Sequence, residues 1–171
     1  EAIKKMMIDV GTKSNDVTLS WENLFSYNRK ILDATSNRYF FVPTPIQLKV
    51  RQVPKVFHAK LPLHPDKPEL GFREYTVTPE GEDKAVDFWI AKKDAETMET
   101  DKVMRLMELF NIKIIQVNLE VIMGSNNPNI ASVEATFASE SYEDVRKIKA
   151  QLIQWIPQGE EFPCQVVMPD A

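Results

Sequence analysis

The sequence predicts a mainly β fold, an antiparallel barrel that is closed or nearly closed, with a helical part before it. Apolar residues recur with helical spacing before Ser36 and alternate from Ile46 onwards. Between these regions Pro43 and Pro45 prevent a helix from continuing, because proline lacks an amide hydrogen and has a fixed φ angle. Beyond them, short alternating segments are separated by regular turn signals, a pattern typical of a barrel.

Two amphipathic helices are expected in the helical part. The first ends before Gly11, a residue that suits the position just past a helix end, and carries the apolar stripe Ile3, Met6, Met7 and Val10. The second begins after Ser20, a good N-cap, and has one apolar face made of Trp21, Leu24, Phe25, Ile31 and Leu32. We expect this face to pack on the other helix or on neighbouring structure.

Alternation after Pro45 predicts strands at 46–51, 56–61, 73–77, 86–90, 112–123, 133–137, 152–156 and 165–168. Turns or loops are expected at 63–71, 79–83 and 124–129, and a short helix within 139–151. The longest strand places one set of residues on a single face: Ile115, Val117, Leu119, Val121 and Met123. The segment 103–110 fits a helix and a strand equally well by periodicity.

Charge is distributed unevenly along the chain. The net charge is −4, yet residues 1–60 contain 10 Lys and Arg against 5 Asp and Glu. A basic part joined to an acidic part is compatible with a phosphate-binding surface on one side, but charge alone favours ordinary solvated faces. No segment approaches the roughly 20 apolar residues of a membrane helix. The lone Cys164 cannot form an internal disulfide and suits a reducing compartment such as the cytoplasm.

The sequence lacks the motifs of several enzyme classes. It has no Walker A, dinucleotide-binding, nucleophile-elbow or zinc-protease motif, and 5 glycines are too few for a phosphate-cradling loop. The sequence has only two histidines and one cysteine, His58, His64 and Cys164, which are too few for a typical structural zinc site. We therefore expect neither catalytic nor metal-binding residues in this chain.

Several segments, in order along nearly the whole chain, resemble the C-terminal half of archaeal-type glutamyl-tRNA synthetases. They are E-A-I-K-K-M-M-I-D-V-G at 1–11, S-W-E-N-L-F-S-Y-N-R-K-I-L-D at 20–33, N-R-Y-F-F-V-P at 37–43, L-H-P-D-K-P-E-L-G-F-R at 63–73, R-L-M-E-L-F-N at 105–111, I-Q-W-I-P at 153–157 and V-V-M-P-D at 166–170. The resemblance implies an anticodon-binding barrel of the type shared by glutamyl- and glutaminyl-tRNA synthetases. It also favours the strand alternative for 103–110.

The resemblance implies a helical junction at 1–42 and the anticodon-binding barrel at 43–171. Members of the family ligate glutamate to tRNA with ATP and magnesium on an N-terminal Rossmann-type domain, whose H-I-G-H-type and K-M-S-K-S-type signatures are absent here. The chain also stops where the family continues into a distal barrel. Both ends are therefore expected to be boundaries of a longer protein. Ala34 replaces a proline that is common in the family, which concerns only the local helix end.

The resemblance also implies site residues. Arg38 matches an arginine that related glutaminyl enzymes place against the middle anticodon base, and Arg105 matches one used at the first base. A planar guanidinium can bond the edge of an unpaired base or stack on it. The basic pair that flanks the third base in those enzymes has no aligned equivalent here, and Lys92 and Lys93 are only nearby substitutes for it. Weaker phosphate candidates are Lys49, Lys60 and Arg73. The alternatives are a helix-end cation for Arg38 and a solvent-facing strand residue for Arg105.

The sequence thus predicts the anticodon-binding part of a glutamyl-tRNA synthetase. Its expected partners are tRNA-Glu, with tRNA-Gln left open, and the catalytic domain of the same parent chain, without DNA or membrane. The main rival is a protein-interaction barrel, in which Phe40, Phe41 and Trp155 are core or interface residues. An independent hydrolase is disfavoured by the missing nucleophile and metal constellations.

Overall fold

The computed structural model describes residues 1–12, 18–33, 35–120 and 129–167. The chain divides into two compact units, one made of Glu1–Arg38 with Cys164–Ala171 and the other of Tyr39–Pro163. The division at 42/43 expected from the sequence stays a prediction. In the described part of the chain, no helix is long and apolar enough to cross a membrane.

The first unit contains the two expected helices, α1 (Ala2–Val10) and α2 (Trp21–Leu32), which pack against each other. Gly11 has a φ angle of 67° and its amide donates to Met7, so α1 ends as predicted. Ser20 caps α2, since its Oγ accepts from the amide of Asn23 at 3.3 Å. A hydrogen bond with Asp9 raises the pKa of Tyr27. None of the residues of α2, all of which are described, is buried.

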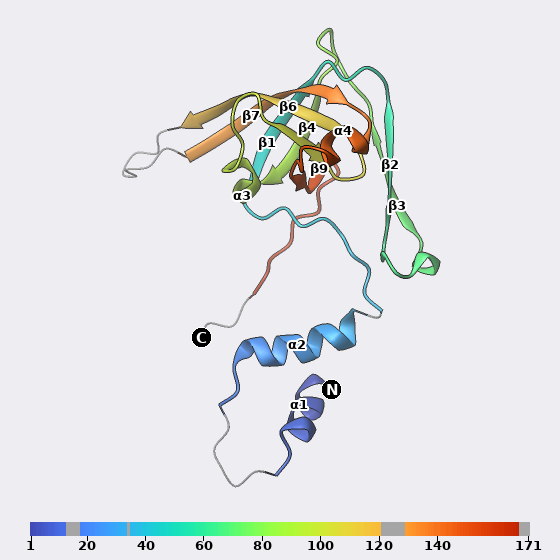
Figure 1. Cartoon of the computed structure of the whole chain (residues 1–171), viewed down its shortest axis with the longest axis vertical. Helices are drawn as coiled ribbons and strands as arrows, with labels where there is room; N and C mark the ends of the chain where they lie inside the picture. Colours follow the sequence, from blue (N-terminus) through green and yellow to red (C-terminus); the bar gives the residue numbers. More distant parts are fainter. Residues whose placement is uncertain (13–17, 34, 121–128, 168–171) are drawn as a thin grey trace. The chain divides into compact units, whose positions relative to one another are not determined.

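The second unit is built from nine described strands and three short helical turns (Figure 1). In chain order they are β1 (Pro45–Arg51), β2 (Phe57–Pro62), η1 (Pro68–Leu70), β3 (Phe72–Val77), β4 (Val86–Ala91), α3 (Lys92–Ala95), β5 (Val103–Leu106), β6 (Asn111–Glu120), β7 (Asn129–Ser139), α4 (Tyr142–Arg146), β8 (Leu152–Ile153) and β9 (Trp155–Pro157). The mainly β prediction is confirmed, and so is the short helix within 139–151.

Seven of these strands form one sheet in the order β8-β5-β6-β7-β1-β4-β9. Its two edge strands are separated only by Gln154, so the sheet curls into a nearly closed barrel. Most neighbours are antiparallel, whereas β1 pairs with β7 and β5 pairs with β8 in parallel. Alternate residues of β1 and β4 point inwards, and Leu48, Val50, Phe88 and Ile90 are among the most buried core residues.

The remaining strands, β2 and β3, pair only with each other and interrupt the chain between β1 and β4. Figure 1 shows them as a two-stranded ribbon. One face of the ribbon is apolar and joins the barrel core, because the rings of Phe57 and Phe110 are 5.0 Å apart and those of Tyr75 and Trp155 are 5.5 Å apart. The other face carries charged residues to the surface.

Three details differ from the sequence-based expectation. The predicted single face of the longest strand is divided: Ile115 and Leu119 are exposed, whereas Val117 packs against the core, because a register shift between Ile114 and Gln116 changes the phase of β6 after Ile112 and Ile114. The segment 103–110 is a strand only as far as Leu106. Residues 165–167 are exposed and not in a strand, so that prediction was wrong. The predicted tip at 124–128 lies outside the described residues.

Candidate nucleic-acid interface

Trp155 anchors the segment that follows Arg38 to the barrel. The Trp155 side chain is completely buried and its Nε1 donates to the carbonyl of Met107 at 2.8 Å. The ring of Phe40 packs at 6.0 Å from it, and the amide of Phe41 donates to Oε1 of Gln154 at 3.0 Å. A ring contact and a backbone hydrogen bond therefore hold this segment on the second unit.

Arg73, on β3, lies over two rings of this segment, and we call Tyr39, Phe40 and Arg73 the arginine–aromatic cluster. The Cζ of Arg73 is 4.5 Å from the ring centroid of Phe40 and 5.5 Å from that of Tyr39, within the range of cation–π contacts. Burial lowers the pKa of Arg73 from its ordinary value, but arginine stays protonated in proteins. Tyr39 is 63% exposed and so offers a surface on which a base can stack.

A second cation and ring lie on the other face of the ribbon. Leu61 is paired with Arg73 in the β2–β3 register, and Lys60 and Phe72 precede them by one residue, which places both on the opposite face from Arg73. The Nζ of Lys60 is 4.5 Å from the Phe72 ring centroid and 3.5 Å from a carboxylate oxygen of Glu74. Both Lys60 and Phe72 are exposed. The ribbon thus combines positive charge with accessible rings, the combination typical of surfaces that bind single-stranded RNA.

Arg38 lies at the end of the first unit, close to the C-terminus of α2. Its Nη2 donates to Oδ1 of Asp33 at 2.7 Å, and its side chain is 48% exposed. The ion pair fits the helix-end alternative, and about half of the side chain is exposed. Recognition by Arg38 therefore remains a prediction.

Arg105 is in a strand but does not face solvent, so the solvent-facing alternative was wrong. Only 8% of it is exposed, and its Nη1 donates to Oδ1 of Asn111 at 2.8 Å and to the carbonyl of Glu140 at 3.1 Å. Its Cζ is 5.5 Å from the ring centroid of Tyr142. The side chain is therefore part of a buried polar network, and its role at a base remains a prediction.

Lys92 and Lys93 begin α3, a helical turn that the sequence did not predict. The Oδ1 of Asp94 accepts from Nε2 of Gln151 at 3.2 Å, and the carbonyl of Gln151 accepts from the amide of Arg105 at 3.0 Å. Two of the regions predicted to bind RNA, the lysine pair and Arg105, are thus linked through Gln151.

The environment of Asp94 leads to a prediction about how stability depends on pH. Burial raises the pKa of Asp94, against the opposing effects of the Gln151 hydrogen bond and the charge of Lys93. A raised folded pKa means that the ionised carboxylate destabilises the fold at neutral pH and that this cost disappears as pH falls through the folded pKa. Asp94→Asn is therefore expected to be more stable than the parent at pH 7 by about 0.5 kcal/mol or less, since Asp94 is partly exposed.

The check is urea denaturation of both proteins at pH 7 and at a pH below the ordinary aspartate value of about 3.9. The difference in unfolding free energy should shrink at the lower pH. A difference that is constant or grows there would contradict the assigned direction of the shift.

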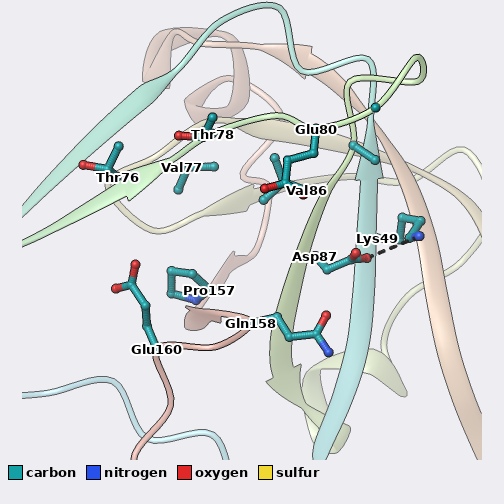
Figure 2. A pocket seen from close by; sticks show the side chains of 12 residues that line it. Lys49, Thr76, Val77, Thr78, Glu80, Val86, Asp87, Pro157, Gln158 and Glu160 are labelled. Atoms are coloured by element: carbon teal, nitrogen blue, oxygen red, sulfur yellow. Dashed lines mark ion pairs between the residues drawn. The ribbon is translucent and has the colours of Figure 1, made fainter.

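Lys49 lies in a different setting. It lines a cavity of about 550 Å³ together with Glu80, Asp87 and Glu160, and its Nζ is 3.7 Å from Oδ1 of Asp87. Figure 2 shows this ion pair and the other two carboxylates among the lining side chains. A phosphate there would meet more negative than positive charge, so we expect Lys49 to attract RNA less than Lys60 does.

Two residues of this region were missed by sequence reasoning, Asn111 and Tyr142. For Asn111 the available signal was its amide side chain at the start of an apolar run, because a buried amide needs hydrogen-bond partners. Within the part of the chain that the structure describes, no group of three or more His, Cys, Asp and Glu residues is placed to hold a metal ion.

Comparison with known proteins extends these observations. Residues 36–135 match the family model described as the anticodon-binding domain of class I tRNA synthetases (E and Q). The chain is 39% identical over 170 residues to a glutamate–tRNA ligase of Pyrococcus abyssi, 37% over 170 to one of Thermococcus kodakarensis and 34% over 171 to one of Methanopyrus kandleri. Each match covers 99% of this chain and 26 or 27% of the relative. The chain therefore spans about a quarter of their length.

Proposed function

Because this chain belongs to the anticodon-binding domain family of the class I glutamyl and glutaminyl tRNA synthetases, we propose that it binds the anticodon loop of a tRNA. The observation that carries the proposal is the arginine–aromatic cluster, in which a guanidinium is stacked beside an exposed tyrosine ring on a barrel of the expected kind. Unpaired loop bases are recognised by stacking on such groups and by hydrogen bonds to their edges.

We propose that Arg38 and the arginine–aromatic cluster contact bases and that Lys60, Lys92 and Lys93 attract phosphate. Arg105 belongs to the interface through its network with Asn111, and Lys49 is the weakest phosphate candidate. The proposed RNA is tRNA-Glu, because the relatives are named glutamate–tRNA ligases. The alternative to be compared is tRNA-Gln.

For the longer parent protein, we propose ligation of glutamate to tRNA with ATP and magnesium in the cytoplasm. None of the residues described here is proposed to bind ATP or magnesium or to take part in the chemical step. Anticodon binding would contribute by orienting the tRNA, because binding energy from a remote site can position the reacting groups. The catalytic domain of the same chain is the proposed intramolecular partner.

The test is a fluorescence-anisotropy titration of a tRNA-Glu anticodon stem-loop with this chain. Parallel titrations use a stem-loop with a scrambled anticodon and the tRNA-Gln stem-loop. Raising salt from about 50 to about 200 mM is expected to weaken binding about 10-fold or more. Contacts with phosphate release counterions from the RNA, and this release is less favourable at high salt. The matched anticodon is expected to bind more tightly than the scrambled one.

Arg38→Ala is expected to lower affinity for the matched loop about 10-fold, the order of one lost arginine–base contact. Arg29→Ala is the control, since it removes a cation from the same helix end without removing a predicted base contact. Equal affinity for both anticodons would reduce the proposal to phosphate attraction. Protein binding without salt-dependent RNA binding would favour the interaction-barrel alternative.

A further inference from the structure

We infer that Tyr142 is a base-stacking residue of the RNA interface and that Arg105 acts by positioning it. The inference rests on the proposed anticodon-binding function and names a contact residue that neither the sequence motifs nor the family resemblance identifies. It also changes the role of Arg105 from a reader of bases to a support for the residue that meets the base.

Arg105 is poorly placed to read a base edge. It is nine-tenths buried, and its Nη1 already donates to a side-chain amide oxygen and to a backbone carbonyl. A direct contact with a base would need these bonds to break, and a buried polar group left without its partners costs about 1–3 kcal/mol. The side chain is therefore suited to holding neighbouring structure in place.

The structure that it holds is the segment 139–141. Asn111, which is completely buried, donates from Nδ2 to Oγ of Ser139 at 2.8 Å and to the carbonyl of Ser141 at 2.7 Å. Arg105 donates to the carbonyl of Glu140 between them. Three consecutive residues are thus bonded to two side chains that are themselves bonded to each other. This arrangement leaves the segment little freedom.

Tyr142 follows directly and is fixed from its other side as well. It is the first residue of α4, which Ser141 caps by accepting from the amide of Glu143 at 3.2 Å, and Val145 buries the helix against the barrel. The Arg105 guanidinium lies over the Tyr142 ring, yet the residue is 48% exposed. A ring backed by a cation and open to solvent is a suitable platform for a base.

The surrounding charges are compatible with RNA. Glu140 is paired with Lys55 at 2.8 Å and Glu143 with Arg146 at 3.4 Å, so neither carboxylate near the ring is an isolated negative charge. Gln151 connects Arg105 to α3, where Lys92 and Lys93 supply positive charge. The lysine pair and the Arg105–Tyr142 pair are therefore connected through Gln151.

The experiment uses the anticodon stem-loop with 2-aminopurine substituted in turn at each loop position, because stacking on an aromatic ring quenches this base. We expect one position to be quenched by the unmodified chain. Tyr142→Ala should abolish that quenching and weaken binding about 10-fold, the order of one lost base–aromatic stack. Tyr142→Phe should keep both. Phe162→Ala removes another exposed ring and should change neither.

A double-mutant cycle separates positioning by Arg105 from direct reading. Positioning predicts that Arg105→Met weakens binding in the parent chain but adds little once Tyr142 is alanine, because the two changes remove the same contact. Direct reading predicts that the two losses multiply. Circular dichroism and thermal unfolding of Arg105→Met report whether the fold persists, and Arg105→Lys, which keeps a donor, should recover part of the quenching.

The outcomes distinguish this inference from the proposed function. Tight, salt-dependent binding that Tyr142→Ala leaves unchanged would overturn the stacking role and leave anticodon binding standing. Multiplied losses in the cycle would overturn the positioning role of Arg105. Failure of the unmodified chain to bind the stem-loop at low salt would overturn the proposed function and this inference with it.

Discussion

Trp155→Ala is expected to lower the free energy of unfolding by about 3–5 kcal/mol, the largest effect that we predict for a single substitution. The side chain is completely buried where Phe40, Tyr75 and Phe88 meet, with ring centroids 5.3 to 6.0 Å from its own. Alanine would leave a cavity among these rings. It would also leave the Met107 carbonyl without the Nε1 donor, which a small apolar side chain cannot replace.

The measurement is urea denaturation followed by circular dichroism, since removing a tryptophan changes the fluorescence itself. Trp21→Ala is the matched control, because Trp21 lies in α2 and is 44% exposed, and we expect it to cost less than about 1 kcal/mol. An unchanged midpoint for Trp155→Ala would show that the barrel does not depend on this contact. A large loss in Trp21→Ala would show that α2 is covered in solution.

Arg73→Ala is expected to have the largest effect on RNA binding, about 10- to 30-fold weaker affinity for the matched stem-loop. The substitution removes a charge and also the planar group that lies over Phe40 and beside the exposed ring of Tyr39. The loss of stacking and of one phosphate or base contact corresponds to about 1.5–2 kcal/mol, within the range for a stacked base. Because the Arg73 side chain is partly buried, circular dichroism of Arg73→Ala is needed beside the titration to check that the barrel remains folded.

Two variants separate charge from shape. Arg73→Lys keeps the charge but not the plane, so we expect it to restore the salt dependence and only part of the affinity. Lys113 lies on β6, and its Nζ is 2.7 Å from Oδ1 of Asp101. Lys113→Ala should therefore change affinity little. Full recovery by Arg73→Lys would mean that the cluster acts only through its charge. Equal losses in Arg73→Ala and Lys113→Ala would mean that the cluster is not a specific contact.

The strands were predictable from the sequence wherever successive residues alternate between the core and the surface. Leu48 and Val50 in β1, and Phe88 and Ile90 in β4, are buried as their spacing predicts. The prediction failed in β6, because a register shift next to Ile114 inserts a residue that alternation does not count. It also failed at 165–167, where alternating apolar residues are present but the backbone is not in a strand.

The candidate site was predictable in part for a similar reason. The sequence places Arg38 beside Tyr39 and Phe40, but Arg73 joins them only when the β2–β3 ribbon returns to the barrel. Nothing local indicates that Arg105 is buried, because its partners, Asn111 and the carbonyl of Glu140, come from other parts of the chain. Nor does the sequence show that Lys49 lines a cavity with three carboxylates.

The sequence by itself therefore determined the class of fold, the helix ends at Gly11 and Ser20, and the family of the chain. These depend on local preferences of the backbone and on motifs that persist in order along the chain. The tertiary structure alone decided which cations are accessible, which are buried and which ring meets each guanidinium. Burial and charge pairing depend on residues distant in sequence, and only the folded barrel and the β2–β3 ribbon bring those residues within contact distance.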